Sequence, residues 1–323
     1  MAEAGVAQIR YLPDRANITA AAHHACTDEL SNIDVAPLDL GPLSGTSLDT
    51  TASARALCAM GCGAVLVLGG DGTNRAFAMG WRDAPVVALS TGTNNAFPQW
   101  IEPTIAGHAA GLVASGNVDI ADVGPAMPLI DITIEGERVD LALVDAVLHA
   151  SDWIGARALT DPTALRAAVV TIPDPAAMGI AGLAGLAGLA GVAGLAGVAG
   201  VAGVASAPGR SALHLQFCSV TAPGCGRLVR APLAPGLYAT VGIDSVEPMP
   251  WGATVTWRGP GVLALDGERE RTLLPGQLVT LTVRDDGPHR IDAAATLRVA
   301  ARRPAQFTMS DRTTSGARKT GDT

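Results

Sequence analysis

The chain has few aromatic residues and an excess of acidic over basic residues, and both features restrict its partners. Only 3% of its 323 residues are aromatic, and 22 Lys and Arg stand against 30 Asp and Glu, which gives a net charge of −8 at pH 7. Nucleic acids and anionic membrane surfaces are bound by basic surfaces. We therefore expect no nucleic-acid partner and no membrane partner, and any phosphate group must be bound locally by loops and a few arginines.

Cysteine and histidine are also scarce, and their spacing gives no metal-binding motif. The five cysteines are odd in number and include no CxxC pair, and the six histidines are scattered. This pattern predicts neither a disulfide framework nor a zinc site. The N-terminus has no long apolar core of the kind found in signal peptides. We expect a cytoplasmic protein with free thiols.

The hydrophobic patterns divide the chain into two domains and a tail. In residues 1–125, apolar strands alternate with helical segments, which predicts a parallel α/β sheet with right-handed crossovers. In residues 126–300 the pattern has a period of two between Gly and Pro residues, which predicts an antiparallel β-sandwich whose last strand is 294–299. The fold class is therefore α/β followed by all-β. Residues 301–323 are polar and predicted to be disordered.

A low-complexity segment of Gly, Ala, Leu and Val interrupts the second domain at residues 179–205. Its length is near the ~20 residues that a membrane-spanning helix needs. However, about every third residue is glycine, which weakens a helix, and no basic flank sets an orientation. We predict a loop expanded by repeats; the alternative is a glycine-faced helix packed on the sandwich.

A glycine-rich turn follows the apolar strand at residues 64–68, which is predicted to be a central strand of the parallel sheet. Such a turn lies at the carboxyl end of its strand, where open α/β sheets bind ligands. Glycine lets a phosphate reach backbone N–H groups and permits positive φ, and Thr73 or Asn74 can cap the next helix. The candidate residues are Gly69, Gly70, Asp71, Gly72, Thr73, Asn74 and Arg75.

A second apolar strand, residues 85–90, ends in another loop of small polar residues, so that two neighbouring strands end in loops of phosphate-binding size. Asp71 is the only carboxylate in this pair of loops. Beside a phosphate, it would hold Mg²⁺ or accept a proton from an attacking hydroxyl. The candidate residues of the second loop are Thr91, Gly92, Thr93, Asn94 and Asn95.

The two loop sequences, GGDGTNR (69–75) and STGTNNAFP (90–98), resemble those of the ATP-NAD kinase superfamily, which includes diacylglycerol kinases and phosphofructokinases. Within it, the chain is most similar to the acetoin catabolism protein X branch, from about residue 60 to about residue 300 apart from the low-complexity segment. The resemblance implies an NAD kinase-like fold, ATP and Mg²⁺ as cofactors, NAD as the default substrate and Asp71 as the catalytic residue.

The resemblance also implies substrate contacts in the second domain, from Asp145, Arg157, Asp266 and Glu268. NAD kinases have Asn-Glu where this chain has Val144-Asp145, and that pair helps to hold the nicotinamide nucleotide. Loss of the amide predicts weaker binding of the same ligand, by about 1–3 kcal/mol, and favours a changed acceptor. Three alternatives remain open: Arg157 in a structural bend, residues 266–268 as a solvent-facing turn, and Arg75 in a surface salt bridge.

One departure from the superfamily bears on activity. Its members usually begin with an extra strand and an Asn-Pro-x-Ser/Ala-Gly loop, which this sequence does not contain. Either translation starts further upstream, or the first βα unit is missing. We predict an ATP-dependent kinase that phosphorylates a hydroxyl of NAD or a related small molecule, as a homo-oligomer, a dimer. The alternatives are a catalytically weak or inactive nucleotide-binding accessory protein of acetoin-type catabolism, and a lipid kinase.

Overall fold

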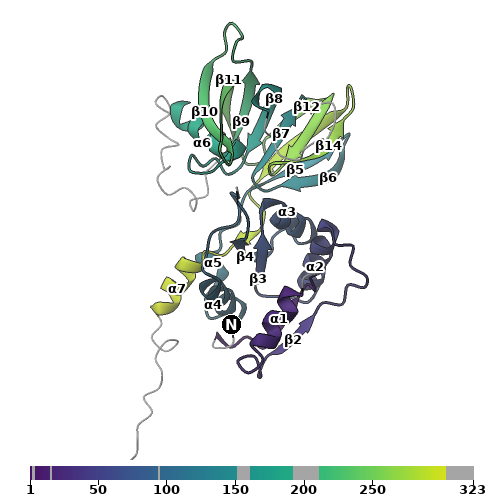
Figure 1. Cartoon of the computed structure of the whole chain (residues 1–323), viewed down its shortest axis with the longest axis vertical. Helices are drawn as coiled ribbons and strands as arrows, with labels where there is room; N and C mark the ends of the chain where they lie inside the picture. Colours follow the sequence, from purple (N-terminus) through teal and green to yellow (C-terminus); the bar gives the residue numbers. More distant parts are fainter. Residues whose placement is uncertain (2–3, 15–16, 94, 151–160, 192–210, 303–323) are drawn as a thin grey trace, which may run out of the picture.

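The computed structural model describes residues 1, 4–14, 17–93, 95–150, 161–191 and 211–302. Figure 1 shows two parts, an α/β domain that contains the N-terminus and a two-layered β-domain. In chain order the elements are β1 (Gln8–Tyr11), α1 (Ile18–Ala25), β2 (Asp34–Pro37), α2 (Ser47–Ala59), β3 (Val65–Gly69), α3 (Asp71–Gly80), β4 (Pro85–Ser90), α4 (Pro103–Ala114), α5 (Ile120–Val123), β5 (Leu129–Ile134), β6 (Glu137–Ala142), β7 (Asp145–His149), the 3₁₀ helix η2 (Pro162–Ala164), β8 (Leu165–Val170), α6 (Gly179–Gly191), β9 (Ser211–Cys218), β10 (Arg227–Ala234), β11 (Leu237–Pro250), β12 (Thr254–Arg258), β13 (Gly261–Leu265), β14 (Glu268–Leu273), β15 (Leu278–Arg284), β16 (His289–Arg290) and α7 (Ala293–Ala301).

The α/β domain contains two parallel sheets, which confirms the predicted fold class. One sheet is the pair β1-β2, and the other has the order β16-β4-β3. The prediction that the strand before the glycine turn is central is wrong. It is the edge strand β3, and its Leu68 side chain is 61% exposed. The continuous apolar run was misleading because β1 and β2 pair with each other, and no strand of the described residues pairs with the outer side of β3.

The chain returns to the α/β domain after the β-domain. Strand β16 pairs in parallel with β4, and helix α7 packs on α4. The predicted strand at residues 294–299 is therefore wrong. Asp292 accepts a hydrogen bond from the Ala295 N–H and caps α7, and Ala293, Thr296 and Ala300 form its buried side. These residues are spaced by three and four, as a helix requires.

The β-domain has two antiparallel sheets, as predicted. A seven-stranded sheet has the order β10-β11-β9-β8-β7-β13-β14, and a four-stranded sheet has the order β12-β15-β5-β6. The two sheets enclose a shared apolar core that includes Ile132, Leu263 and Leu281, all with no exposed surface. Strands β5 and β6 form an antiparallel hairpin in the smaller sheet.

Helix α6 covers the outer face of the seven-stranded sheet, where it contacts β8, β9, β10 and β11. Its Leu183, Ala184 and Ala187 side chains are fully buried there. For residues 179–191 the loop prediction is therefore wrong and the alternative, a helix packed on the sandwich, is right; residues 192–205 lie outside the described residues. Within the described part of the chain, no helix is both long and apolar enough to cross a membrane.

The expectation of free thiols is wrong for two of the five cysteines, which form a disulfide. Cys218 ends β9 and Cys225 lies just before β10, and both strands flank β11. Their Cα atoms are 5.8 Å apart, which is within the usual range for a disulfide. Cys26, Cys58 and Cys62 are free thiols, as expected.

Two partly buried arginines, Arg82 and Arg75, join the domains. Arg82, after α3, donates to Asp131 of β5 (Nη1 to Oδ1, 2.8 Å) and to Asp286 after β15 (Nη2 to Oδ1, 2.6 Å). Arg75 of α3 donates to Asp140 of β6 (Nη1 to Oδ1, 3.0 Å). Charge-assisted bonds of this kind are stronger than neutral ones, so they hold α3 against the β-domain.

Candidate active site

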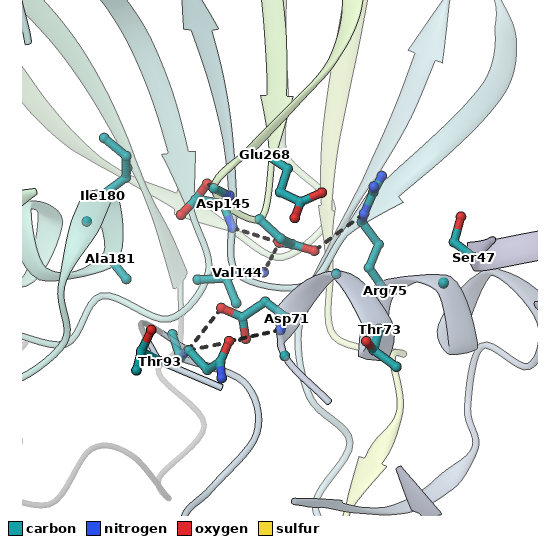
Figure 2. Close-up of a pocket in the computed structure, with 18 of the residues that line it drawn as sticks. Ser47, Asp71, Thr73, Arg75, Thr93, Val144, Asp145, Ile180, Ala181 and Glu268 are labelled. Atoms are coloured by element: carbon teal, nitrogen blue, oxygen red, sulfur yellow. Dashed lines mark hydrogen bonds and ion pairs between the residues drawn. The ribbon is translucent and has the colours of Figure 1, made fainter. Parts of the chain in front are cut away.

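A cavity of about 690 Å³ lies between the two domains, at the carboxyl ends of β3 and β4. Figure 2 shows Asp71, Thr73 and Arg75 of α3 on one side of it and Asp145 and Glu268 of the β-domain on the other. The carboxyl end of a parallel sheet is where α/β proteins bind ligands. The structure thus brings most of the predicted residues together in one cavity.

The first loop is tightly packed at two of its three glycines, Gly69 and Gly70, where a side chain has no space. A Cβ on Gly69 would lie 2.5 Å from the Thr73 side chain, and one on Gly70 would lie 2.7 Å from Asn95 Oδ1. None of Gly69, Gly70 and Gly72 has a positive φ, although glycine permits one. The expectation that Thr73 or Asn74 caps α3 is also wrong, because the N-cap is Gly70.

The Asp71 carboxylate is held by the second loop. It accepts hydrogen bonds from the N–H groups of Phe97 (2.8 Å) and Ala96 (3.0 Å), and the residue is only 8% exposed. The pKa of Asp71 is raised, chiefly because burial penalises the charged form, while these N–H groups and the charge of Arg290 oppose the shift. Arg290 donates a hydrogen bond to the Phe97 carbonyl (2.8 Å) and so stabilises the second loop.

The other second-loop residues have different positions. Asn95 accepts from the Asp71 N–H (3.3 Å) and donates to Ser90 Oγ (2.9 Å), so it connects the two loops. Thr93 and Asn95 line the cavity. Thr91 and Gly92 are not among the described residues that line the cavity. Asn94 lies outside the described residues. Asn74 is buried and donates to the Gly70 carbonyl (2.9 Å), which makes it a support for the first loop.

Two buried carboxyl groups face Asp71 from the β-domain. Asp266, in the turn after β13, accepts hydrogen bonds from the N–H groups of Leu143 (3.0 Å) and Val144 (2.7 Å). The alternative of a solvent-facing turn at residues 266–268 is therefore wrong for Asp266, whose side chain has no exposed surface. Burial, followed by the charge of Asp71, raises the pKa of Asp266 to about 7, against the opposing charge of Arg75.

Asp145, the first residue of β7, lines the cavity beside Val144. The residue is 4% exposed, and its Oδ1 accepts from the Gly267 N–H at 3.3 Å. Burial and then the charges of Asp266 and Asp71 raise the pKa of Asp145 well above its usual value. The domain interface therefore holds three carboxyl groups in a medium that disfavours their charged forms.

Arg75 and Glu268 also line the cavity. The Arg75 side chain is 12% exposed and pairs with Asp140, so the alternative of a surface salt bridge is wrong. Its Nε atom lies 3.9 Å from Asp266 Oδ2. Arg157 lies outside the described residues.

The sequence analysis missed two parts of the cavity wall. Thr46, Ser47 and Thr50 line it at the start of α2, and Met178 to Ala181 line it at the start of α6. A signal existed for the first set, because a loop rich in Gly, Ser and Thr follows β2 as similar loops follow β3 and β4. The second set lay in the segment predicted to be a loop.

Mg²⁺ fits this site only if the protein and the phosphate groups of a substrate bind the ion together. Among the described residues, no group of three or more His, Cys, Asp or Glu side chains is placed to hold a metal ion. Mg²⁺ in phosphate-transfer sites is commonly held by one or two carboxylates together with substrate phosphates and water. Asp71 keeps free lone pairs beyond its bonds to Ala96 and Phe97, so it can serve as such a carboxylate.

The raised pKa of Asp266 predicts that stability decreases as pH rises. A carboxyl group whose pKa is about 7 in the folded state and 3.8 otherwise keeps its proton longer in the folded protein. Its contribution is complete below the lower value and is lost as pH rises to the upper one, with a slope of at most about 1.4 kcal/mol per pH unit. Urea unfolding across this pH window measures the slope. We expect Asp266→Asn to flatten it, and equal slopes in the two proteins would contradict the assignment.

Two family models match the chain. Residues 8–118 match the ATP-NAD kinase N-terminal domain, and residues 128–286 match the acetoin catabolism protein X C-terminal domain. The acetoin catabolism protein X of Cupriavidus necator is 36% identical over 311 residues, which cover 94% of this chain and 82% of that protein. The chain belongs to the acetoin catabolism protein X family.

Membership of the acetoin catabolism protein X family confirms the resemblance inferred from the two loops. Among solved structures, yeast NADH kinase complexed with NADH is similar with a TM-score of 0.48 and 13% identity, covering 96% of this chain and 89% of that chain. In this member of the family, Val144 and Asp145 both line the cavity between the domains.

Proposed function

We propose that this protein is a kinase that transfers the γ-phosphoryl group of ATP to a hydroxyl group of NAD or a related metabolite. The observation that carries the proposal is the buried Asp71 carboxylate. It lies between two glycine-containing loops, at the carboxyl ends of two parallel strands, and lines a cavity large enough for a small-molecule substrate. The match of residues 8–118 to the ATP-NAD kinase N-terminal domain supports the same activity.

Phosphoryl transfer depends mainly on positioning and on neutralising charge. In this proposal, backbone N–H groups at the start of α3 bind phosphate oxygens, and the hydroxyl group of Thr93 adds a polar contact. Asp71 is fixed by Ala96 and Phe97, so it keeps one position beside the phosphates. A bound Mg²⁺ would be held by Asp71 together with phosphate oxygens, and it would neutralise phosphate charge.

The acceptor side of the cavity supports a change of substrate relative to NAD kinases. Val144, Ile180 and Ala181 form an apolar part of its wall, and Val144 stands where NAD kinases have an amide by resemblance. Apolar side chains provide no hydrogen bond to a carboxamide, and an unpaired polar group of a ligand costs binding energy. A smaller and more apolar hydroxy metabolite would lose less binding energy at this apolar wall than NAD would.

The test is ADP formation by the purified full chain with Mg²⁺ and ATP, with and without NAD, in wild type and Asp71→Ala. NAD-dependent ADP and NADP formation that disappears in the variant would support the kinase with NAD as acceptor. ADP formation only with a smaller hydroxy compound would move the assignment to that acceptor.

A nucleotide-binding accessory protein is the second candidate, and one observation favours it. The apolar Val144 lines the cavity where NAD kinases have an amide by resemblance, so a nucleotide acceptor loses a hydrogen bond there while ATP binding at the glycine loops is unaffected. A protein that binds ATP in a calorimetric titration but forms no ADP with any acceptor would support this function. The name of the Cupriavidus necator relative agrees with a place in acetoin catabolism for either candidate.

A further inference from the structure

The three buried carboxyl groups of the cavity differ in how fully the protein satisfies them. Asp71 accepts from two backbone N–H groups, with a shortest distance of 2.8 Å. Asp266 accepts from the N–H groups of residues 143, 144 and 145, with a shortest distance of 2.7 Å. Asp145 has one long bond, 3.3 Å from the Gly267 N–H, and no other side-chain hydrogen bond among the described residues. Asp145 is therefore the carboxyl group with the most capacity left for a ligand.

The Asp145 carboxyl group is placed so that a ligand in the cavity can use its remaining hydrogen-bonding capacity. Figure 2 shows its carboxyl group above Asp71, on the side where Ile180 and Ala181 of α6 lie. Within the described part of the chain, only one Asp145 oxygen accepts a hydrogen bond, whereas both oxygens of Asp71 accept N–H groups of the second loop. A hydroxyl group bound between Asp145 and α6 would face the nucleotide loops from the opposite domain.

We propose that Asp145 is the general base that takes the proton from the acceptor hydroxyl, while Asp71 positions the phosphate groups. The inference rests on the proposed kinase function. In the step, the acceptor O–H proton passes to an Asp145 oxygen, and the acceptor oxygen forms a bond to the γ-phosphorus of ATP. The bond from that phosphorus to the bridging oxygen breaks, and its electron pair leaves with ADP. The proton is released to water after the product leaves.

The electrostatic surroundings of Asp145 suit this role. Burial and the neighbouring Asp266 and Asp71 raise its pKa, and a carboxylate with a raised pKa is a stronger base. Arg75 does not cancel this effect, because it pairs with Asp140 and lies near Asp266 instead. The other charged groups that line the cavity are Asp71, Arg75, Asp266 and Glu268. We therefore expect activity to rise with pH as Asp145 loses its proton.

The decisive variant is Asp145→Asn in the full chain, assayed for ADP formation with Mg²⁺, ATP and the acceptor that the wild type uses. Asparagine has the shape of the protonated side chain and keeps an acceptor oxygen for Gly267, so the variant is expected to fold. We expect kcat to fall by about 10²- to 10⁴-fold, the usual contribution of a general base. The KM for ATP should stay within a few fold of wild type, and the acidic limb of the pH profile should be lost.

Three further proteins make the result specific. Asp145→Glu keeps a carboxylate and should recover part of kcat together with the acidic limb. Asp244→Asn changes an exposed aspartate of β11 and should leave kcat and its pH profile unchanged. Asp71→Asn should raise the KM for ATP as well as lower kcat, because we place Asp71 beside the phosphates.

The failure of this inference is distinct from the failure of the proposed function. A wild type that turns over while Asp145→Asn keeps kcat within about threefold would overturn the base assignment and leave the kinase in place. Loss of activity in Asp145→Asn together with an unchanged acidic limb, or with a melting temperature well below that of Asp244→Asn, would also reject it. A wild type that forms no ADP with any acceptor would contradict both the base assignment and the proposed kinase function.

Discussion

Replacing Asp71 by asparagine is expected to lower ADP formation by at least about 10²-fold, because an aligned charge at the phosphates is lost. The amide side chain of the variant would keep an oxygen that can accept from the Phe97 N–H, so the second loop should stay near its present position. Steady-state ADP release at saturating ATP and acceptor measures the effect. Loss of less than about threefold would contradict a role for Asp71 in phosphoryl transfer.

Comparison with Asp71→Ala separates this electrostatic role from the structural role of Asp71, which is to accept hydrogen bonds from the second loop. Alanine leaves the buried N–H group of Phe97 and the partly buried N–H group of Ala96 without this acceptor, and an unpaired buried group costs about 1–3 kcal/mol. We therefore expect Asp71→Ala to be less stable to urea than Asp71→Asn, while both lose activity. Asp244→Asn is the matched control for removal of an exposed negative charge, and it should change neither quantity.

The sequence predicted the elements that carry the site better than the arrangement around them. The strand at 85–90 and the glycine turn after β3 were placed correctly, because apolar runs that end in small polar residues are local signals. The edge position of β3 depends on where β1, β2 and β16 pair, which are contacts between distant segments. Such pairing has no signature in the residues of β3 itself.

The roles of Arg75 and Asp145 illustrate the same limit in the site. Arg75 follows the glycine turn directly, which suggested a phosphate contact, but its partner Asp140 is 65 residues away in the sequence. The strongly raised pKa of Asp145 comes from burial, from Asp266 of the same domain and from Asp71, which comes near only where the two domains meet. The loop pattern identified Arg75 as a candidate and the family resemblance identified Asp145, but only the three-dimensional arrangement separates a domain contact from a cavity carboxyl group.

Two predictions failed for different reasons: the loop predicted at 179–205 is a helix over its described part, 179–191, and the strand predicted at 294–299 is also a helix. Glycine lowers helix propensity by about 1 kcal/mol per residue, yet in α6 the glycines let the helix lie against backbone of the preceding segment. In α7 the apolar residues fit both a period of two and a helix, and the deciding contact is the Asp292 cap. Tertiary packing decided the first case and a local cap the second.

Gly185→Ala is expected to destabilise the protein although alanine is the better helix former. A Cβ on Gly185 would lie 2.3 Å from the backbone nitrogen of Pro175 and 2.5 Å from the carbonyl carbon of Asp174. Backbone atoms cannot yield without moving the segment that precedes α6, and such overpacking typically costs about 1–3 kcal/mol. This cost exceeds the gain of about 1 kcal/mol in helix propensity. Urea unfolding of the two proteins measures the difference.

Gly188→Ala in the same helix is the matched control. Its Cβ would lie 3.3 Å from the end of the flexible Leu213 side chain, so we expect a neutral or slightly stabilising effect from the better helix propensity. Because Met178 to Ala181 line the cavity, displacement of α6 in Gly185→Ala should also weaken binding of the acceptor while ATP affinity is kept. Equal stability and equal acceptor affinity in the two variants would mean that α6 does not rest on residues 174 and 175 and does not shape the acceptor side.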